Sequence, residues 1–202
     1  MFTSRISATL LYMKKTKQPA ASYRILGIDP GTNVLGYAVL QVTGKHLEAL
    51  DIGVVYMKHL DQHQYKLKKI FERLQSIIHT YQPREMAVEA PFYGKNPQSM
   101  LKLGRAQGVA IAAGITKGVE VTEYSPKKIK VAITGSGNAS KEQVSAMLDS
   151  ILQVKLEKKY LDATDALAVA LCHHYQSSSV LGGQKRYSDW SSFLKDNPQR
   201  KG

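Results

Sequence analysis

Four carboxylates stand at positions where this sequence could use them for chemistry. Asp29 interrupts the apolar run Ile25–Ile28 just before a Pro-Gly turn, and Glu89 ends a second short apolar run. A carboxylate in a buried strand is costly unless a hydrogen bond, a cation or a proton neutralises it. Asp29 therefore either caps the turn that follows it or binds a cation.

The other two carboxylates, Asp162 and Asp165, begin a predicted helix that runs to about Tyr175. Residues three positions apart on a helix share a face, so both side chains point the same way. The helix dipole also favours acids in the first turn, so helix stability alone explains this pair equally well.

Considered together, the four acids indicate a metal site. A dry cluster of anions repels itself strongly unless divalent cations sit inside it. Ligation by oxygen alone selects hard ions, Mg²⁺ or Mn²⁺. Two such ions roughly 4 Å apart would clamp a phosphate, activate a water and stabilise the leaving oxygen. The acids therefore make the chain a candidate nuclease.

The charge balance points to a polyanionic partner. The chain has 28 Lys and Arg against 16 Asp and Glu, a net charge of +12, and such an excess is typical of proteins that bind nucleic acid. The basic residues include the first 23 positions, which carry no acid, and a basic and polar segment at 125–141.

Cysteine usage and hydropathy exclude several classes of protein. A single cysteine, Cys172, allows no internal disulfide, and the default compartment is a reducing cytoplasm. No apolar stretch is long enough to span a membrane. The sequence Cys172-His173-His174 suggests zinc, but adjacent helical residues point in different directions and no second cluster has zinc spacing, so we do not predict a zinc site.

Hydrophobic periodicity predicts the elements that must position the acids. A hairpin and a third strand come first, followed by alternating helices and strands, which indicates an α/β domain with a mixed five-stranded sheet flanked by helices. The predicted strands are 25–29, 34–42, 47–57, 86–89 and 119–124, and the predicted helices are 64–81, 97–117, 141–152 and 162–175. We expect residues 24–175 to form one domain, residues 1–23 to be a disordered basic extension, and residues 176–202 to be a mobile tail.

The helix at 97–117 is rich in glycine and alanine. A glycine inside a helix costs about 1 kcal/mol relative to alanine, so we expect a close approach of another backbone to offset that cost. The helix packs closely either on the sheet or on a second subunit.

Four motifs in order resemble the RuvC family of Holliday-junction resolvases. They are Gly-Ile-Asp-Pro-Gly-Thr at 27–32, Val-Glu at 88–89 followed by Phe92, Leu-Lys-Leu-Gly-Arg-Ala-Gln-Gly-Val-Ala at 101–110, and Asp-Ala-Thr-Asp-Ala-Leu-Ala at 162–168. The resemblance runs from about Arg24 to Tyr175. It implies a ribonuclease-H-like fold and a Mg²⁺-dependent endonuclease that resolves four-way DNA junctions in recombination and repair.

The resemblance also implies roles for individual residues. Asp29, Glu89, Asp162 and Asp165 would bind two Mg²⁺ ions, which Mn²⁺ could replace, and catalyse phosphodiester hydrolysis. Phe92 would stack on an unpaired junction base, consistent with the stacking on aromatic side chains that single strands favour. The remaining candidates for DNA contact are basic: Lys130 and Lys141 by the resemblance, then Lys127, Lys128 and Arg105.

The family acts as a homodimer that nicks two strands symmetrically, as a two-fold junction requires, and works with the RuvA–RuvB branch-migration proteins.

Three other hypotheses about the function compete with this one. An actin-like ATPase shares the Asp-Pro-Gly-Thr motif but needs a second phosphate loop and a longer chain. A catalytically silent junction-binding module gains nothing from clustered acids. A different nuclease or transposase of the same fold would have the same site.

Overall fold

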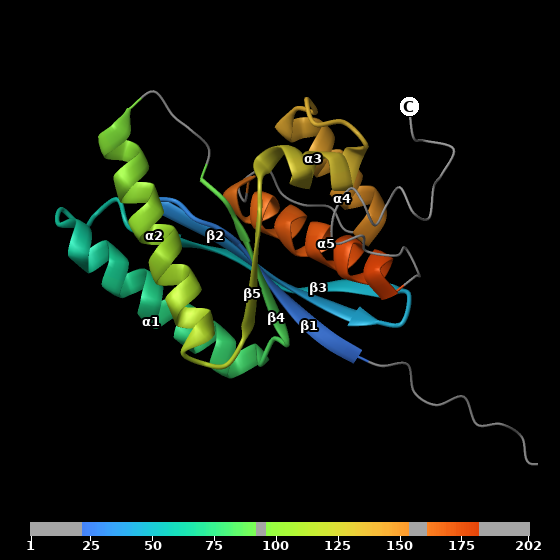
Figure 1. Ribbon diagram of the computed structural model, residues 1–202, viewed down its shortest axis with the longest axis horizontal. Helices are drawn as coiled ribbons and strands as arrows, with labels where there is room; N and C mark the ends of the chain where they lie inside the picture. Colours follow the sequence, from blue (N-terminus) through green and yellow to red (C-terminus); the bar gives the residue numbers. More distant parts are fainter. Residues whose placement is uncertain (1–21, 92–95, 154–160, 182–202) are drawn as a thin grey trace, which may run out of the picture.

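The computed structural model describes residues 22–91, 96–153 and 161–181, and within them it contains one five-stranded sheet. The order across the sheet is β3-β2-β1-β4-β5 (Figure 1). The strands are β1 (Ser22–Asp29), β2 (Val34–Thr43), β3 (His46–Tyr56), β4 (Glu85–Glu89) and β5 (Glu120–Tyr124). This mixed sheet confirms the predicted fold class.

The sheet changes direction at β1. β1, β2 and β3 form an antiparallel meander, whereas β4 runs parallel to β1, and β5 runs parallel to β4. Ile28 of β1 lies beside Val88 of β4, and Glu89 lies beside Tyr124 of β5. Because parallel neighbours end at the same edge of a sheet, the chain leaves β1, β4 and β5 on one side of the molecule.

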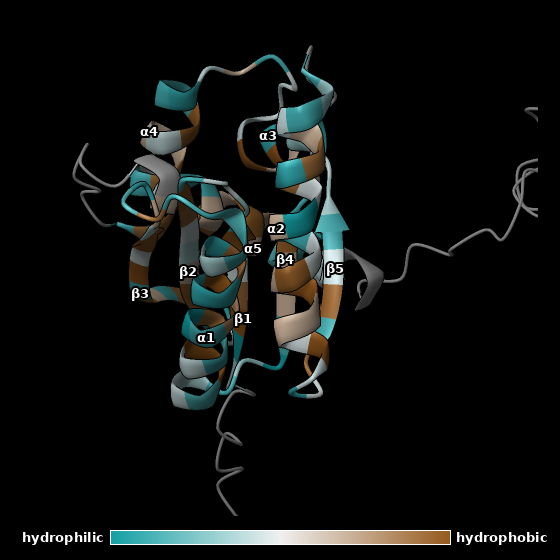
Figure 2. Ribbon diagram, turned by 90° about the vertical axis from the view of Figure 1, so that its left-hand side faces the viewer, coloured by the Kyte–Doolittle hydropathy of each residue, from teal (hydrophilic) through white to brown (hydrophobic). Residues whose placement is uncertain are grey.

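Two layers of helices cover the sheet (Figures 1 and 2). The first layer consists of α1 (His63–Tyr81) and α2 (Pro97–Ile115), and the opposite layer consists of α3 (Pro126–Thr134), α4 (Lys141–Leu152) and α5 (Leu161–Leu181). Alternate side chains of β1 pack on opposite faces of the sheet: Leu26 and Ile28 pack with α1 and α2, while Ile25 packs with α5. The sheet is therefore buried on both faces. No helix in the described segments combines the length and the apolar character that crossing a membrane requires.

The helix starts follow from local sequence. Asn96 caps α2 by accepting hydrogen bonds from the backbone of Gln98 and Ser99, and Pro97 takes the first helical position. At α4 the predicted capping box is present, with Ser140 and Gln143 bonded reciprocally.

One helix and one helix end differ from the prediction. The basic segment at 125–141 contains a helix, α3, which begins with Ser125 as N-cap and Pro126 at its first position and buries Ile129 and Ile133. The polar composition of the segment hid the spacing of these two isoleucines. The last helix continues beyond the predicted Tyr175 to Leu181, so part of the expected tail is helical.

Helix α5 lies against β1 at a glycine. A Cβ on Gly27 would lie 2.1 Å from the carbonyl oxygen of Ala166 and 2.9 Å from the Cβ of Ala170. Real Cβ atoms do not approach a backbone carbonyl so closely, so only glycine lets the helix sit at this depth. This contact fixes the height of α5 above the sheet.

We expect Gly27→Ala to destabilise the protein by about 2–3 kcal/mol, because the new methyl group meets rigid backbone and must push α5 away. Urea unfolding followed by circular dichroism measures this loss. Gly114→Ala is the matched control, since its new Cβ would meet side-chain atoms and no backbone, the flexible end of Met86 at 2.9 Å and Cγ2 of Val121 at 3.0 Å, and alanine favours the helix. Equal unfolding midpoints for the two variants would show that the close approach of α5 is not required.

Candidate active site

Three of the four predicted acids line one cleft. Asp29 ends β1 and Glu89 ends β4, and these strands are parallel neighbours, so both side chains leave the sheet at the same edge. Asp165 reaches that edge because the next residue of α5, Ala166, lies over Gly27. The three carboxylates line a cleft of about 640 Å³. Asp162 lies in α5 one turn before Asp165, and its side chain is outside the described residues.

The opposite wall of the cleft is basic. Lys127 and Lys130 project from α3 and Lys141 from the start of α4, and all three line the cleft. The Nζ of Lys141 lies 2.6 Å from Oδ2 of Asp165, an ion pair across the cleft. Acids from the sheet and α5 thus face lysines from α3 and α4, an arrangement suited to a phosphate bound between them.

The electrostatics of the cleft are most evident at Glu89. Burial, together with the charge of Asp165, raises the pKa of Glu89 to about 7, although Lys141 and Lys130 act in the opposite direction. Burial thus disfavours the charged form of Glu89 more than the lysines around the cleft favour it.

The acids match the chemistry of a hard divalent cation. Each is an oxygen donor, and the pKa of Glu89 is raised by burial and by the charge of Asp165, both of which a bound cation would offset. Within the described side chains, which omit Asp162, no group of three or more His, Cys, Asp or Glu residues is assembled closely enough to hold a metal ion.

The other predicted DNA contacts are placed differently. Lys128 lies outside the cleft with its Nζ 5.0 Å from the ring centroid of Tyr124, and Arg105 is exposed on α2 away from the cleft lining. Phe92 lies outside the described residues.

The structure adds cleft residues that sequence reasoning did not identify. Ser125 and Asn138 line the main cleft, and Gln107 of α2 lines a smaller hollow beside it. The Ser125-Pro126 pair was a usable signal because it marks a helix start, which would have placed α3 and its lysines. Asn138 and Gln107 carry no comparable pattern.

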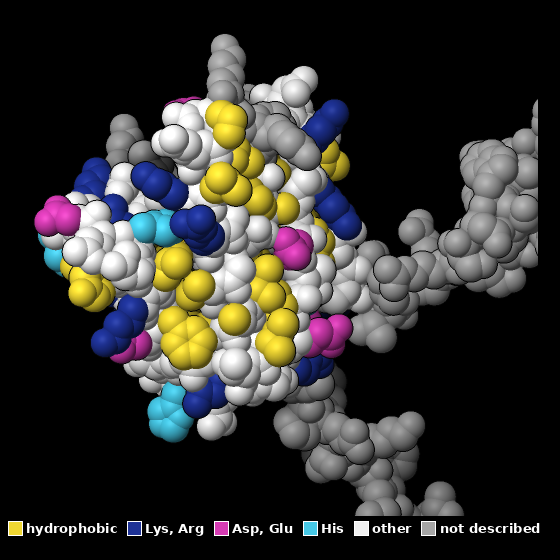
Figure 3. All heavy atoms as spheres, turned by 60° about the vertical axis from the view of Figure 1, so that its left-hand side comes forward, with side chains coloured by type: hydrophobic (Ala, Val, Ile, Leu, Met, Phe, Trp, Pro, Cys, Tyr) yellow, Lys and Arg dark blue, Asp and Glu magenta, His cyan; other side chains and the backbone are white. Residues whose placement is uncertain are grey.

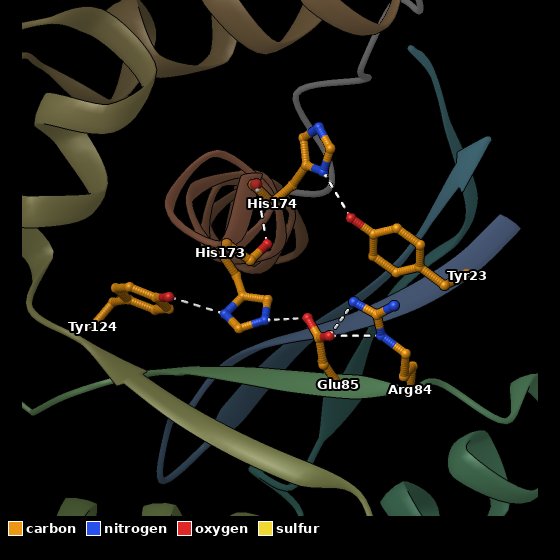
Figure 4. Close-up of polar contacts among 7 residues, drawn as sticks. Tyr23, Arg84, Glu85, Tyr124, His173 and His174 are labelled. Carbon is orange, nitrogen blue, oxygen red and sulfur yellow. Dashed lines mark hydrogen bonds and ion pairs between the residues drawn. The ribbon is translucent and has the colours of Figure 1, made fainter. Parts of the chain in front are cut away.

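The side chains of His173 and His174 are bonded to different protein partners. His173 is buried, its Nε2 donates to Glu85 at 2.6 Å because a carboxylate can only accept, and its Nδ1 is hydrogen-bonded to the hydroxyl of Tyr124 at 2.9 Å (Figure 4). His174 instead contacts the hydroxyl of Tyr23 at 3.2 Å. The two rings point to different partners, as expected for neighbours on a helix.

The charges around Glu85 are balanced within this network. Burial raises the pKa of Glu85, but hydrogen bonds from His173 and Arg84, with the charge of Arg84, outweigh it and hold the pKa below its usual value. Arg84 also lies over the ring of Tyr23, 4.0 Å from its centroid. The network ties α5 to β4 and β5, at a distance from the cleft acids along the helix.

A mixed sheet of this order, with acids at the ends of β1 and β4 and on the helix that crosses them, defines a nuclease of the ribonuclease-H-like class. Comparison with known proteins identifies the family. The family model described as "Crossover junction endodeoxyribonuclease RuvC" matches residues 25–173, and the chain belongs to this family.

Relatives and solved structures agree with this assignment. The chain is 55% identical to the crossover junction endodeoxyribonuclease RuvC of Cytophaga hutchinsonii, over 87% of this chain and 86% of that protein. It is 50% identical to that of Bacteroides fragilis, over 91% and 98% of the two chains. The structure of Thermus thermophilus RuvC in complex with a Holliday junction substrate matches with a TM-score of 0.73 and 31% identity, covering 78% of this chain and 96% of that one. The chain is accordingly a crossover junction endodeoxyribonuclease.

The pKa of Glu89 predicts how stability depends on pH without metal. Its folded-state pKa of about 7 exceeds the ordinary 4.5, so ionisation of Glu89 costs the native state stability as pH rises through this window. In EDTA, Glu89→Gln should be about 1–2 kcal/mol more stable than wild type at pH 8, and the gain should vanish below about pH 4.5.

Unfolding by urea at a series of pH values measures this difference. Glu142→Gln on α4 is the control, because a hydrogen bond with Ser140 lowers the pKa of Glu142, so its substitution should lose stability as pH rises. If the gain in stability of Glu89→Gln did not depend on pH, the pKa of Glu89 would not be raised by its surroundings in the folded protein.

Proposed function

We propose that the cleft resolves Holliday junctions by two-metal phosphodiester hydrolysis. The observation that supports this is the convergence of Asp29, Glu89 and Asp165, from three separate elements, in one cleft with a lysine wall. Asp162, one helical turn from Asp165, would complete the ligand set. When bound, two Mg²⁺ ions, or Mn²⁺ in their place, would supply an activated water and neutralise charge on the leaving oxygen.

The residues of the chain would prepare the cleft for that chemistry. Lys127 and Lys130 would attract and orient the phosphate backbone from the α3 side, which contributes affinity without reading sequence. Lys141, paired with Asp165, would hold that carboxylate in place and lies close enough to the acids to contact the bound phosphate. Phe92, which follows the Glu89 strand, would stack on an unpaired base at the junction.

Symmetric cleavage requires a second copy of the chain, and α2 offers the surface for it. Leu101 and Ile115 are 64% and 61% exposed, and open space faces Gly104 and Gly108 between them. Figure 3 shows hydrophobic side chains gathered on the face formed by α1 and α2. The close backbone approach expected at these glycines does not occur within the described chain, so we propose that α2 packs against its counterpart in a homodimer.

Two further proposals rest on the family alone. The enzyme would act in DNA recombination and repair in the cytoplasm, together with the RuvA–RuvB branch-migration proteins. Co-purification of the chain with those proteins on a four-way junction would test the partnership.

We expect Asp29→Asn to lower the rate of junction cleavage roughly a thousandfold or more, because a metal at such a site contributes several kcal/mol to transition-state stability. Junction binding should remain intact or improve, since one negative charge has left the cleft. The measurement is cleavage of a synthetic four-way junction and a matched linear duplex, in Mg²⁺ and in EDTA, with gel-shift binding in EDTA.

Glu72→Gln, an exposed carboxylate substitution on α1, is the control and should cleave like wild type. Loss of both cleavage and binding in Asp29→Asn would indicate misfolding. Tight binding by wild type with no cleavage under any condition would favour the silent binding module, and equal cleavage of junction and duplex would leave a general nuclease.

The dimer proposal predicts that Ile115→Glu is monomeric where wild type is dimeric, because a charge would be buried without a partner at the proposed interface. Analytical ultracentrifugation at micromolar concentration measures the change. Leu50→Glu, at an exposed position on β3, is the control and should stay dimeric. A monomeric wild-type chain would rule out α2 as the dimer surface.

A further inference from the structure

A second, smaller hollow of about 200 Å³ opens beside the cleft acids, on the side of α2. Asp29 and Glu89 line both hollows, as does Pro126 at the start of α3. Whatever occupies the smaller hollow therefore lies directly beside the phosphate that the acids would process.

Besides the two acids, the described lining of the smaller hollow is apolar except for one polar side chain. Pro30, Pro91 and Leu103 form walls, and proline rings hold their shape because φ is fixed. The polar group is the amide of Gln107, which is only 7% exposed although it lines the hollow.

A carboxylate behind the amide sets its orientation. Nε2 of Gln107 donates a hydrogen bond to Oε2 of Glu123 on β5, and a carboxylate can only accept, so the nitrogen must face Glu123. Oε1 of Gln107 accepts no hydrogen bond from any described residue. The oxygen is therefore held ready to accept one from an occupant of the hollow.

The charges of the hollow exclude a phosphate as that occupant. Its described lining contains two acids and neither Lys nor Arg, and a third acid, Glu123, lies behind Gln107. A nucleobase fits better, because it is uncharged, has flat apolar faces for the proline walls, and carries N–H donors on its edge.

We propose that this hollow binds an unpaired base of the cleaved strand, next to the scissile phosphate, and that Gln107 makes cleavage depend on the identity of that base. The inference rests on the proposed junction cleavage and extends it to a specificity-determining residue. A base that satisfies Gln107 would place its phosphate on the acids, whereas a base that leaves the amide unpaired would hold the phosphate out of position.

The test uses the full chain and a panel of four-way junctions that differ only in the bases flanking the cleavage position. Wild type should cleave the best and worst sequences at different rates under single-turnover conditions. Gln107→Met keeps the length and helix propensity of the side chain but removes the amide, so it should reduce the ratio of best to worst by about tenfold. Junction binding in EDTA and the unfolding midpoint should stay at wild-type values.

Gln75→Met is the matched control. Gln75 also anchors α2 through its amide, with Nε2 2.9 Å from both the carbonyl of Ala113 and the hydroxyl of Thr116, but it lies on the α1 side away from the hollow. Its substitution should leave the ratio unchanged, which separates base reading from helix anchoring.

Three results would overturn the inference. Equal slowing of Gln107→Met on every sequence would make Gln107 a support for the acids and not a base contact. Retention of the full wild-type ratio by Gln107→Met would leave the hollow without a role in specificity. A wild-type enzyme that cleaves no junction would instead refute the proposed function on which the inference depends.

Discussion

The contact between α5 and β1 at Gly27 is the constraint on which the active site depends. The carbonyl of Ala166 occupies the space that any other side chain at position 27 would need. Because α5 sits so low on the sheet, Asp165 reaches the edge where β1 and β4 end in Asp29 and Glu89. Without that depth the acids would still be present but would not face one another across a single cleft.

The far part of α5 is held by a different kind of interaction. His173 is fixed between Glu85 and Tyr124, so the helix is bonded to both β4 and β5, the strands that lead into the active site. A buried polar network of this kind specifies one arrangement, since a small shift of the helix would leave buried groups unpaired. Close packing sets the height of α5, and hydrogen bonding sets its position along the sheet.

Two of the described acids of the cleft differ in how their charge is compensated. Asp165 is paired with Lys141, whereas burial and repulsion raise the pKa of Glu89 to about 7. Such a site favours a divalent cation, which relieves repulsion that a fully compensated site would not have. The lysines come from α3 and α4, elements outside the sheet, so the basic wall and the acidic floor are built by different parts of the chain.

The sequence by itself determined the strands, most of the helices and the identity of the acids, because these depend on local periodicity, turn residues and motif order. It did not reveal α3, because the lysines of that segment made the Ile129–Ile133 spacing hard to recognise. It also did not identify Gln107 as a residue of the hollow, since burial of a glutamine cannot be read from the sequence until its neighbours are known. Only the tertiary structure decided which groups share a cleft. Asp29, Glu89 and Asp165 meet through the parallel pairing of β1 with β4 and the crossing of α5, and both are contacts between segments far apart in the chain, which no local pattern encodes.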